Sequence, residues 1–465
     1  MNPAIVDAVR HQFGDYAGHI YDRPDVKIYV DDARGFIARS NERYDLIQAA
    51  VIDTWAATSS GAFALSENSL YTQEAFLTYF DHLTPNGVLS MSRWYFEEQP
   101  AEALRLISLG LAAWERAGVD DPSQHIAVVV NFDNYLSPEA MATVMLKRSP
   151  FTPQEVAAMQ REAKRLNFDL LYAPGLTDLP STPVTALIQA PNRKTFIANY
   201  PLDISPSTDD RPFFFSLVRF GDTLRPGWEI SGVHLFSRQA IEVLGWLLMI
   251  TLALALVFVL GPLAFVWRRR QNRPTRLRAQ TPRLIYFACL GIGFMLVEIP
   301  VVQRLSVYLG HPIYAMVVVL FVLLLFSGLG SLTTARFAPD QAPEIIRRVL
   351  LALGIIGLAH VLLLSRVLVA TQAWTLLPRI LSSIVLLAPL GFVMGQAYPL
   401  GLKWVNAQSP EVIPWMWAVN GSTSVVGSVL SVIVAIHAGF RIALLAGLLA
   451  YGLAWGSTWL MRRMN

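Results

Sequence analysis

The sequence is poor in charged residues and contains a single cysteine. Only 15% of its 465 residues are Asp, Glu, Lys or Arg, against about 25% in ordinary soluble domains, and 54% are hydrophobic. The lone Cys289 excludes a disulfide scaffold and a cysteine-rich metal site. Neither a P-loop nor a His/Cys cluster with metal-ligand spacing occurs, so we expect no bound metal. This composition excludes a disordered chain and argues against a wholly soluble protein.

The two halves of the chain differ in charge, although the net charge is only +3. Residues 236–465 contain 18 Lys and Arg but 5 Asp and Glu, whereas residues 1–235 contain 19 basic and 29 acidic residues. A boundary near residue 236 therefore separates an acidic part of the chain from a basic, apolar part.

The second half contains long apolar segments. Residues 243–267 form 25 positions without a charge, enough to cross about 30 Å of hydrocarbon. Six further segments follow at 284–303, 313–332, 349–365, 380–399, 412–436 and 442–460. The segments at 284–303 and 349–365 are the weakest candidates for membrane spans, so a total of six or eight helices is also possible. We predict an integral, multi-pass membrane protein with a bundle of about seven helices, whose partner is the lipid bilayer.

Arginine and lysine are distributed unequally between the predicted loops. Thirteen lie in one set of alternate loops and at the C-terminus, and four lie in the other set. Because basic residues mark cytoplasmic loops, the C-terminus is predicted to be cytoplasmic, in a membrane such as the bacterial cytoplasmic membrane. Seven helices would then place residues 1–235 outside the cytoplasm, which conflicts with any use of a cytosolic nucleoside there.

Polar residues within the apolar segments are candidates for a site. Glu298 is costly in hydrocarbon and is a functional candidate, although an ion pair with Arg304 or a position at headgroup level explains it equally well. Asn420 suggests a local helix break or an interhelical hydrogen bond. Small residues predict close helix packing. They lie at positions 327, 328, 330, 331, 391, 395, 452 and 456.

The first half alternates strand-like and helix-like segments. Strands are predicted at 26–30, 44–52 and 88–91, with helices at 33–40 and 73–83, the latter capped by Thr72, and a turn at 85–87. This alternation predicts an α/β domain with a parallel sheet. Asp31, Asp32 and Asp53 would then lie at carboxyl ends of strands, where ligands bind in such sheets.

The remaining residues of the first half are less informative. An amphipathic helix is predicted at 101–117, strands at 125–131 and 142–147, and a further helix at 153–166. Segments 174–190 and 201–212 have the composition of connectors. We divide the chain into an α/β domain at 1–150, an α/β extension and connector at 151–235, and a transmembrane helical domain at 236–465.

Four short motifs follow one another along the first half. They are V-D-D-A-R-G-F-I at 30–37, Y-D-L-I at 44–47, S-L-Y-T at 69–72 and L-T-P-N-G-V-L at 83–89. In this order and spacing they resemble the spermidine synthase (polyamine aminopropyltransferase) family. Segments 209–215, 293–299, 309–312 and 415–428 are similar to membrane-bound spermidine synthase-like proteins. The resemblance implies a Rossmann-like, methyltransferase-type fold. It also implies transfer of an aminopropyl group from decarboxylated S-adenosylmethionine to a polyamine-type amine.

The resemblance assigns roles to two aspartates. Asp32 corresponds to the acid that binds the adenine amino group of decarboxylated S-adenosylmethionine. Asp53, eight positions after Asp45, corresponds to the aspartate that deprotonates the attacking amine. Ala50 stands where the family has another aspartate, which predicts a changed amine substrate or none.

The family's glycine-rich loop and first strand have no counterpart in residues 1–235, which hold no G-x-G-x-x-G segment before a helix. Asn2-Pro3-Ala4 resembles the residues directly after the family's ribose-binding Glu. We therefore expect the chain to be the C-terminal part of a longer protein, with impaired activity on its own and no binding of S-adenosylmethionine or its decarboxylated form.

Three alternatives stay open beside the aminopropyltransferase. One is a transporter or channel with Glu298 and Asn420 in its site. Another is a different S-adenosylmethionine-dependent transferase, such as a methyltransferase. The third is a non-catalytic membrane protein. No nucleic-acid partner is expected, and homo-oligomerisation stays open.

Overall fold

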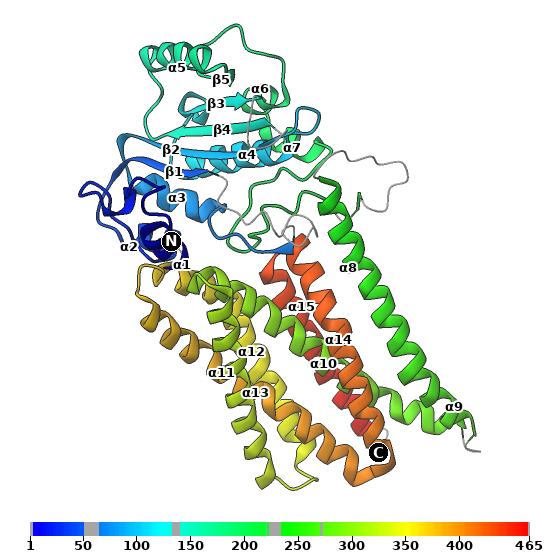
Figure 1. Ribbon diagram of the computed structural model, residues 1–465. Coiled ribbons are helices and arrows are strands. Elements are labelled where there is room, and N and C mark those ends of the chain that lie inside the picture. Colours follow the sequence, from blue (N-terminus) through cyan, green and yellow to red (C-terminus); the bar gives the residue numbers. More distant parts are fainter. Residues whose placement is uncertain are drawn as a thin grey trace. The chain divides into compact units, whose positions relative to one another are not determined.

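The chain forms two compact units in the computed structural model, which describes residues 3–50, 65–132, 140–219, 221–222, 234–269 and 273–463. The described part of the α/β unit consists of residues 3–50, 68–132, 140–208 and 372–374. The helical unit contains the rest of the described residues. Figure 1 draws both units.

A five-stranded mixed sheet forms the centre of the α/β unit (Figure 1). Its strands are β1 (Tyr44–Ala50), β2 (Leu83–Tyr95), β3 (Ile126–Asn131), β4 (Ala140–Lys147) and β5 (Asp169–Tyr172). They lie in the order β1-β2-β4-β3-β5, and only the pair β1-β2 is parallel. The prediction of a parallel sheet is therefore wrong beyond this pair. Eight residues join β3 to β4, too few for a parallel crossover, so these two strands pair antiparallel.

The first predicted strand, residues 26–30, is absent from the described sheet. This segment has no regular structure, and Tyr29 and Val30 are half exposed. An isolated strand needs a partner to satisfy its backbone groups, and no described strand pairs with this one. The helix that follows does form, as α2 (Ala33–Arg39).

Helix α3 (Gln73–Asp81) connects the two parallel strands, as predicted. The Thr72 hydroxyl accepts a hydrogen bond from the Ala75 amide at 3.2 Å, which caps the first turn. The predicted turn at 85–87 lies within β2 as an irregularity in its pairing with β1. Gly87 is required there, because a Cβ atom would come within 2.6 Å of the Tyr44 carbonyl oxygen.

Further helices cover the sheet. Helix α4 (Ala101–Arg116) lies against β2 and β4, between α3 and α6 (Pro183–Ile188) (Figure 1). Thirteen of its sixteen residues are buried, so burial extends beyond the single apolar face that the amphipathic prediction implied. Helix α5 (Pro153–Leu166) begins with a capping box between Thr152 and Glu155. Segment 174–190, predicted as a connector, includes α6, and α7 (Arg193–Asn199) follows it.

The helical unit contains seven helices long and apolar enough to cross a membrane among the described residues. The first span joins α8 (His234–Ala255), a π-helical turn (Leu256–Leu260) and α9 (Gly261–Arg269). The other six are α10 (Arg273–Leu309), α11 (Pro312–Thr333), α12 (Ala342–Ala370), α13 (Leu376–Gln408), α14 (Ile413–Ala438) and α15 (Phe440–Arg463). The predicted seven apolar helices are confirmed.

The outward faces of these helices are apolar. Val243 and Phe258 of the first span are 63% and 70% exposed, and Leu324 of α11 is 68% exposed. Large apolar side chains exposed in such number mark a surface that meets lipid tails. The helical unit thus has the surface of a multi-pass membrane protein.

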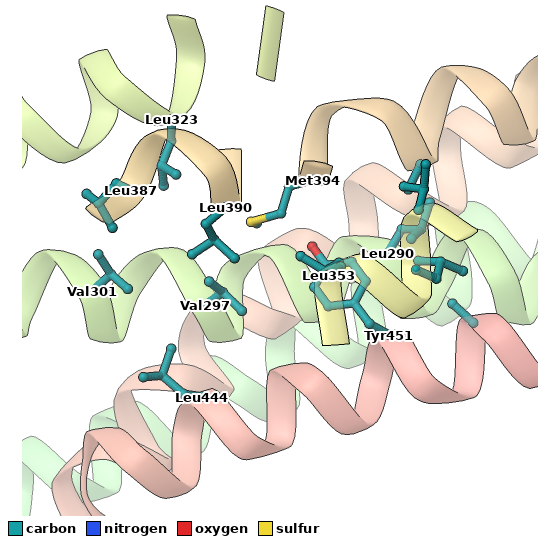
Figure 2. Close-up of a cluster of buried hydrophobic side chains, with 14 of the residues drawn as sticks. Leu290, Val297, Val301, Leu323, Leu353, Leu387, Leu390, Met394, Leu444 and Tyr451 are labelled. Atoms are coloured by element: carbon teal, nitrogen blue, oxygen red, sulfur yellow. The ribbon is translucent and has the colours of Figure 1, made fainter. Parts of the chain in front are cut away.

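Two sets of helices pack closely inside this unit. Helix α10 runs along α14 and α15, while α11 runs along α13 (Figure 1). Leu290 and Val297 of α10 meet Met394 of α13 and Tyr451 of α15 in the shared core (Figure 2). This core lies between the two sets of helices.

Small residues allow the closest approaches. A Cβ on Gly330 or Gly395 would come within about 2 Å of a backbone oxygen of the neighbouring helix. The predicted packing role of Gly330 and Gly395 is therefore confirmed. It is wrong for Gly328, Gly452 and Gly456, whose added Cβ would meet no described atom within 4 Å.

Candidate functional site

Asp31 and Asp32 start a helix instead of ending a strand. The Asp32 carboxylate accepts a hydrogen bond from the Gly35 amide at 2.7 Å and caps α2. Asp31 accepts from the Asp32 amide at 2.8 Å and pairs with Arg39. Their expected place at a strand end was wrong because residues 26–30 form no strand. Asp53, the other expected site residue, lies outside the described residues.

A buried polar cluster lies toward the carboxyl end of β2. Arg93 donates to the Glu102 carboxylate of α4 at 3.1 Å, and each side chain is only 3% exposed. Arg93 also donates to the Tyr71 hydroxyl at 3.2 Å and lies over the Tyr71 ring. No sequence pattern pointed to this cluster, because a spacing of nine positions between Arg93 and Glu102 does not indicate that both side chains are buried.

Asn420 ties two membrane helices together. Its Nδ2 donates to the Phe287 carbonyl oxygen of α10 at 3.0 Å, and α14 is unbroken through it. Of the two predictions for Asn420, the interhelical hydrogen bond is confirmed and the helix break is wrong.

Glu298 makes no ion pair within the described part of the chain. Arg304, its expected partner, lies 3.8 Å from the carboxylate of Asp210 and also bonds to Ser365. Glu298 is half-buried and shares a face of α10 with Phe294 and Met295, four and three positions before it. It therefore lies one turn beyond the residues that line the cavity described next.

An open cavity of about 500 Å³ lies in the helical unit, lined by residues of α10, α11, α13, α14 and α15. Its lining is mainly apolar, and a few polar side chains converge on it. These are Ser327, Ser331, Tyr398, Asn420, Ser424 and Tyr451. A cavity of this size, lined in this way, is typical of a small-molecule site.

Tyr398 is the most unusual residue of the lining. Its ring makes edge-to-face contacts with Phe287 and Trp417, with ring centroids 5.4 and 5.3 Å apart. Its hydroxyl is buried and finds no hydrogen-bond partner in the part of the chain that the structure describes. Tyr398 was not among the predicted site residues. The adjacent Pro399, which lies inside the continuous helix α13, was the available signal.

The Asp209-Asp210-Arg211 segment has a structural role. The Asp210 carbonyl accepts from the Phe440 amide at 2.9 Å, and its carboxylate accepts from the Arg441 amide at 3.1 Å. Arg211 donates to the Ile436 carbonyl at 2.8 Å. The segment therefore caps both helix ends at the turn between α14 and α15.

Comparison with known proteins adds no identification. No protein-family model matches the chain, and no curated protein matches it significantly.

Proposed function

We propose that the protein is an integral membrane relative of the spermidine synthases, whose α/β unit transfers an aminopropyl group to an amine. The helical unit holds this α/β unit at the membrane. Decarboxylated S-adenosylmethionine is the proposed group donor, and a polyamine-type amine is the acceptor.

The strand order of the α/β unit is the observation that carries this proposal. A helix, α3, connects the parallel strands β1 and β2, and antiparallel β4 lies between β2 and β3. Since β2 and β3 both run antiparallel to β4, they run in the same direction. Strand β4 is therefore reversed and lies between β2 and β3, which share a direction. This arrangement supports a Rossmann-like sheet of the methyltransferase type.

The proposed chemistry needs two acidic side chains. Asp32 would accept a hydrogen bond from the adenine amino group. A carboxylate has about four acceptor positions, so capping α2 is compatible with this role. Asp53 would take the proton from the amine as its nitrogen bonds to the aminopropyl carbon and the carbon–sulfur bond breaks. The electron pair of that bond goes to sulfur, which becomes a neutral thioether.

Binding of the group donor tests the proposal. In calorimetry in detergent, a form of the protein extended by the family's glycine-rich loop and first strand should bind decarboxylated S-adenosylmethionine saturably. Asp32→Asn in that form should weaken binding by about tenfold or more, the loss expected for one charge-assisted hydrogen bond. Asparagine is as good an N-cap as aspartate, so this variant keeps α2 and removes only the carboxylate. Binding that is absent, or equal in the variant, would count against the proposal.

A further inference from the structure

Two arginines lie over exposed tryptophans at the end of α15. The Cζ atom of Arg463 is 3.4 Å from the centroid of the Trp459 ring. Arg347, from the second turn of the neighbouring α12, lies over the Trp455 ring at 5.4 Å. Trp455 and Trp459 are 42% and 47% exposed on the outer surface of a helix long enough to span a membrane. The proposed transfer reaction does not involve these four residues.

The two guanidinium groups have no acidic partner in the part of the chain that the structure describes. Glu344, on the first turn of α12, pairs with Arg348 at 3.3 Å and with Arg462 at 3.2 Å. Arg347 and Arg463 make neither an ion pair nor a hydrogen bond with the described residues. Stacking on a ring uses the flat face of a guanidinium group and leaves the N–H donors at its edge available. Two permanent charges are therefore free to bind an anion at this surface.

The charge at this end of the helical unit favours an anionic ligand. Residues 340–348 and 462–463 contain four arginines and two acids, Asp340 and Glu344. Guanidinium groups bind phosphate oxygens in a bidentate manner, and basic sites between membrane helices attract anionic lipid headgroups. A zwitterionic headgroup would add an ammonium group to this positive field. An anionic headgroup therefore fits better.

Two glycines lie on the same face of α15, farther from its end. Gly452 and Gly456 are one turn apart and alternate with Trp455 and Trp459 along the helix. A Cβ added to either glycine meets no described atom within 4 Å. Gly452 lies eleven residues before Arg463, or about 16 Å along the helix axis. An acyl chain that starts near the arginines can therefore lie along the bare backbone beside the indole rings.

We propose that this surface, formed by Arg347, Gly452, Trp455, Gly456, Trp459 and Arg463, binds one anionic glycerophospholipid. We call it the α15 lipid face. The two arginines bind the headgroup, and the indole rings lie at the level of the glycerol, where tryptophan is enriched in membrane proteins. One acyl chain follows the glycines toward the bilayer centre. This inference is independent of the activity of the α/β unit.

Native mass spectrometry of the full chain, purified in detergent, measures the binding. Phosphatidylglycerol should add saturably as one lipid, and phosphatidylcholine with the same acyl chains should bind about tenfold more weakly. Arg463→Gln should raise the half-saturating concentration of phosphatidylglycerol about tenfold, as loss of one charge-assisted hydrogen bond predicts. Arg336→Gln is the matched control, because Arg336 lies over Phe337 in the loop before α12 and outside the α15 lipid face. This control should bind phosphatidylglycerol as the unaltered protein does.

A second pair of variants tests the path of the acyl chain. Gly456→Leu places a side chain on that path, whereas Gly421→Leu adds the same side chain at an equally open position of α14. Binding of phosphatidylglycerol should be weakened in the first variant and retained in the second.

Several outcomes would overturn the proposal. They are equal binding of the two lipids, equal binding by Arg463→Gln and Arg336→Gln, and displacement of phosphatidylglycerol by inorganic phosphate at constant ionic strength. The last outcome would assign the arginines to a free anion. A dimer that Gly456→Leu converts to a monomer, without an effect on lipid binding, would assign this face to a second copy of the chain and would equally contradict the proposal.

Discussion

The Nδ2 atom of Asn420 lies 3.0 Å from the carbonyl oxygen of Phe287 and donates a hydrogen bond that joins α14 to α10. Phe287 also contacts the ring of Tyr398 from α13. One residue of α10 therefore meets a polar residue of α14 and an aromatic residue of α13, beside the cavity. We expect this junction to matter for the stability of the bundle.

Replacing Asn420 should weaken the junction. Asn420→Leu keeps the size of the side chain and removes the donor, so the free energy of unfolding should fall by about 1 kcal/mol, as for other hydrogen bonds between membrane helices. Ser428→Ala is the control, because the Ser428 hydroxyl bonds only within its own helix, to Val425 at 2.8 Å. Equal thermal midpoints for the two variants in detergent would contradict the prediction.

Enlarging a glycine should have opposite effects at two positions. Gly330→Ala places a Cβ about 2 Å from the Phe392 carbonyl oxygen, so α11 and α13 must move apart, at a cost of about 1–3 kcal/mol. Gly452→Ala meets no described atom within 4 Å, and it should leave stability unchanged or raise it slightly. Thermal unfolding of both variants in one detergent measures the difference. A smaller loss for Gly330→Ala than for Gly452→Ala would refute the described packing.

The buried pair in the α/β unit should tolerate the loss of both partners better than the loss of one. Glu102→Leu leaves the Arg93 guanidinium buried without its counter-ion, which costs about 3–5 kcal/mol. Combining it with Arg93→Met removes that charge, so much of the loss should be recovered. Chemical unfolding followed by hydrogen exchange in α4 tests this, and an additive double variant would disprove the coupling.

Lys147 and Glu155 make the stability of α5 depend on pH. Desolvation raises the pKa of Glu155, but hydrogen bonds from Lys147 and Thr152 outweigh it, so the net pKa is lowered. A lowered folded pKa stabilises the protein above the usual glutamate value of about 4.3, and this contribution is lost as pH falls through the folded pKa.

Hydrogen exchange in α5 measures this contribution. Protection of the α5 amides from exchange should decrease as the pH falls below the usual glutamate value of about 4.3. Glu155→Gln should remove this pH-dependent part of the protection. Arg165 and Glu162 form an exposed pair on the same helix, so Glu162→Gln should leave most of the dependence in place. A pH profile unaffected by Glu155→Gln would contradict the assignment.

Local sequence signals predicted the first and last residue of some elements. Helix α5 begins and ends as expected, at 153 and 166, because the Thr152–Glu155 capping box and the adjacent proline act within one turn. The seven apolar spans were also predictable, since length and hydropathy alone determine whether a helix can cross a membrane.

Features that depend on distant partners could not be predicted. Residues 26–30 have a strand-like composition, but strand formation needs a neighbour, and the described sheet provides none. The motif of Gly452 and Gly456 does not reveal whether another helix approaches it. The cavity of the helical unit depends on five helices meeting at one place, which no sequence window contains.

Turnover in the Asp53→Asn variant tests the proposed transferase activity most directly. A form of the protein extended by the family's glycine-rich loop and first strand should transfer the aminopropyl group of decarboxylated S-adenosylmethionine to an amine. Asp53→Asn should lower the rate at neutral pH by about 100-fold or more, the usual contribution of a general base. The loss should shrink as pH rises, because more of the amine is then already neutral. Asp45→Asn, at an exposed aspartate bonded to Thr84, is the control and should retain turnover. Turnover unchanged by Asp53→Asn, or absent with every amine tested, would contradict the account.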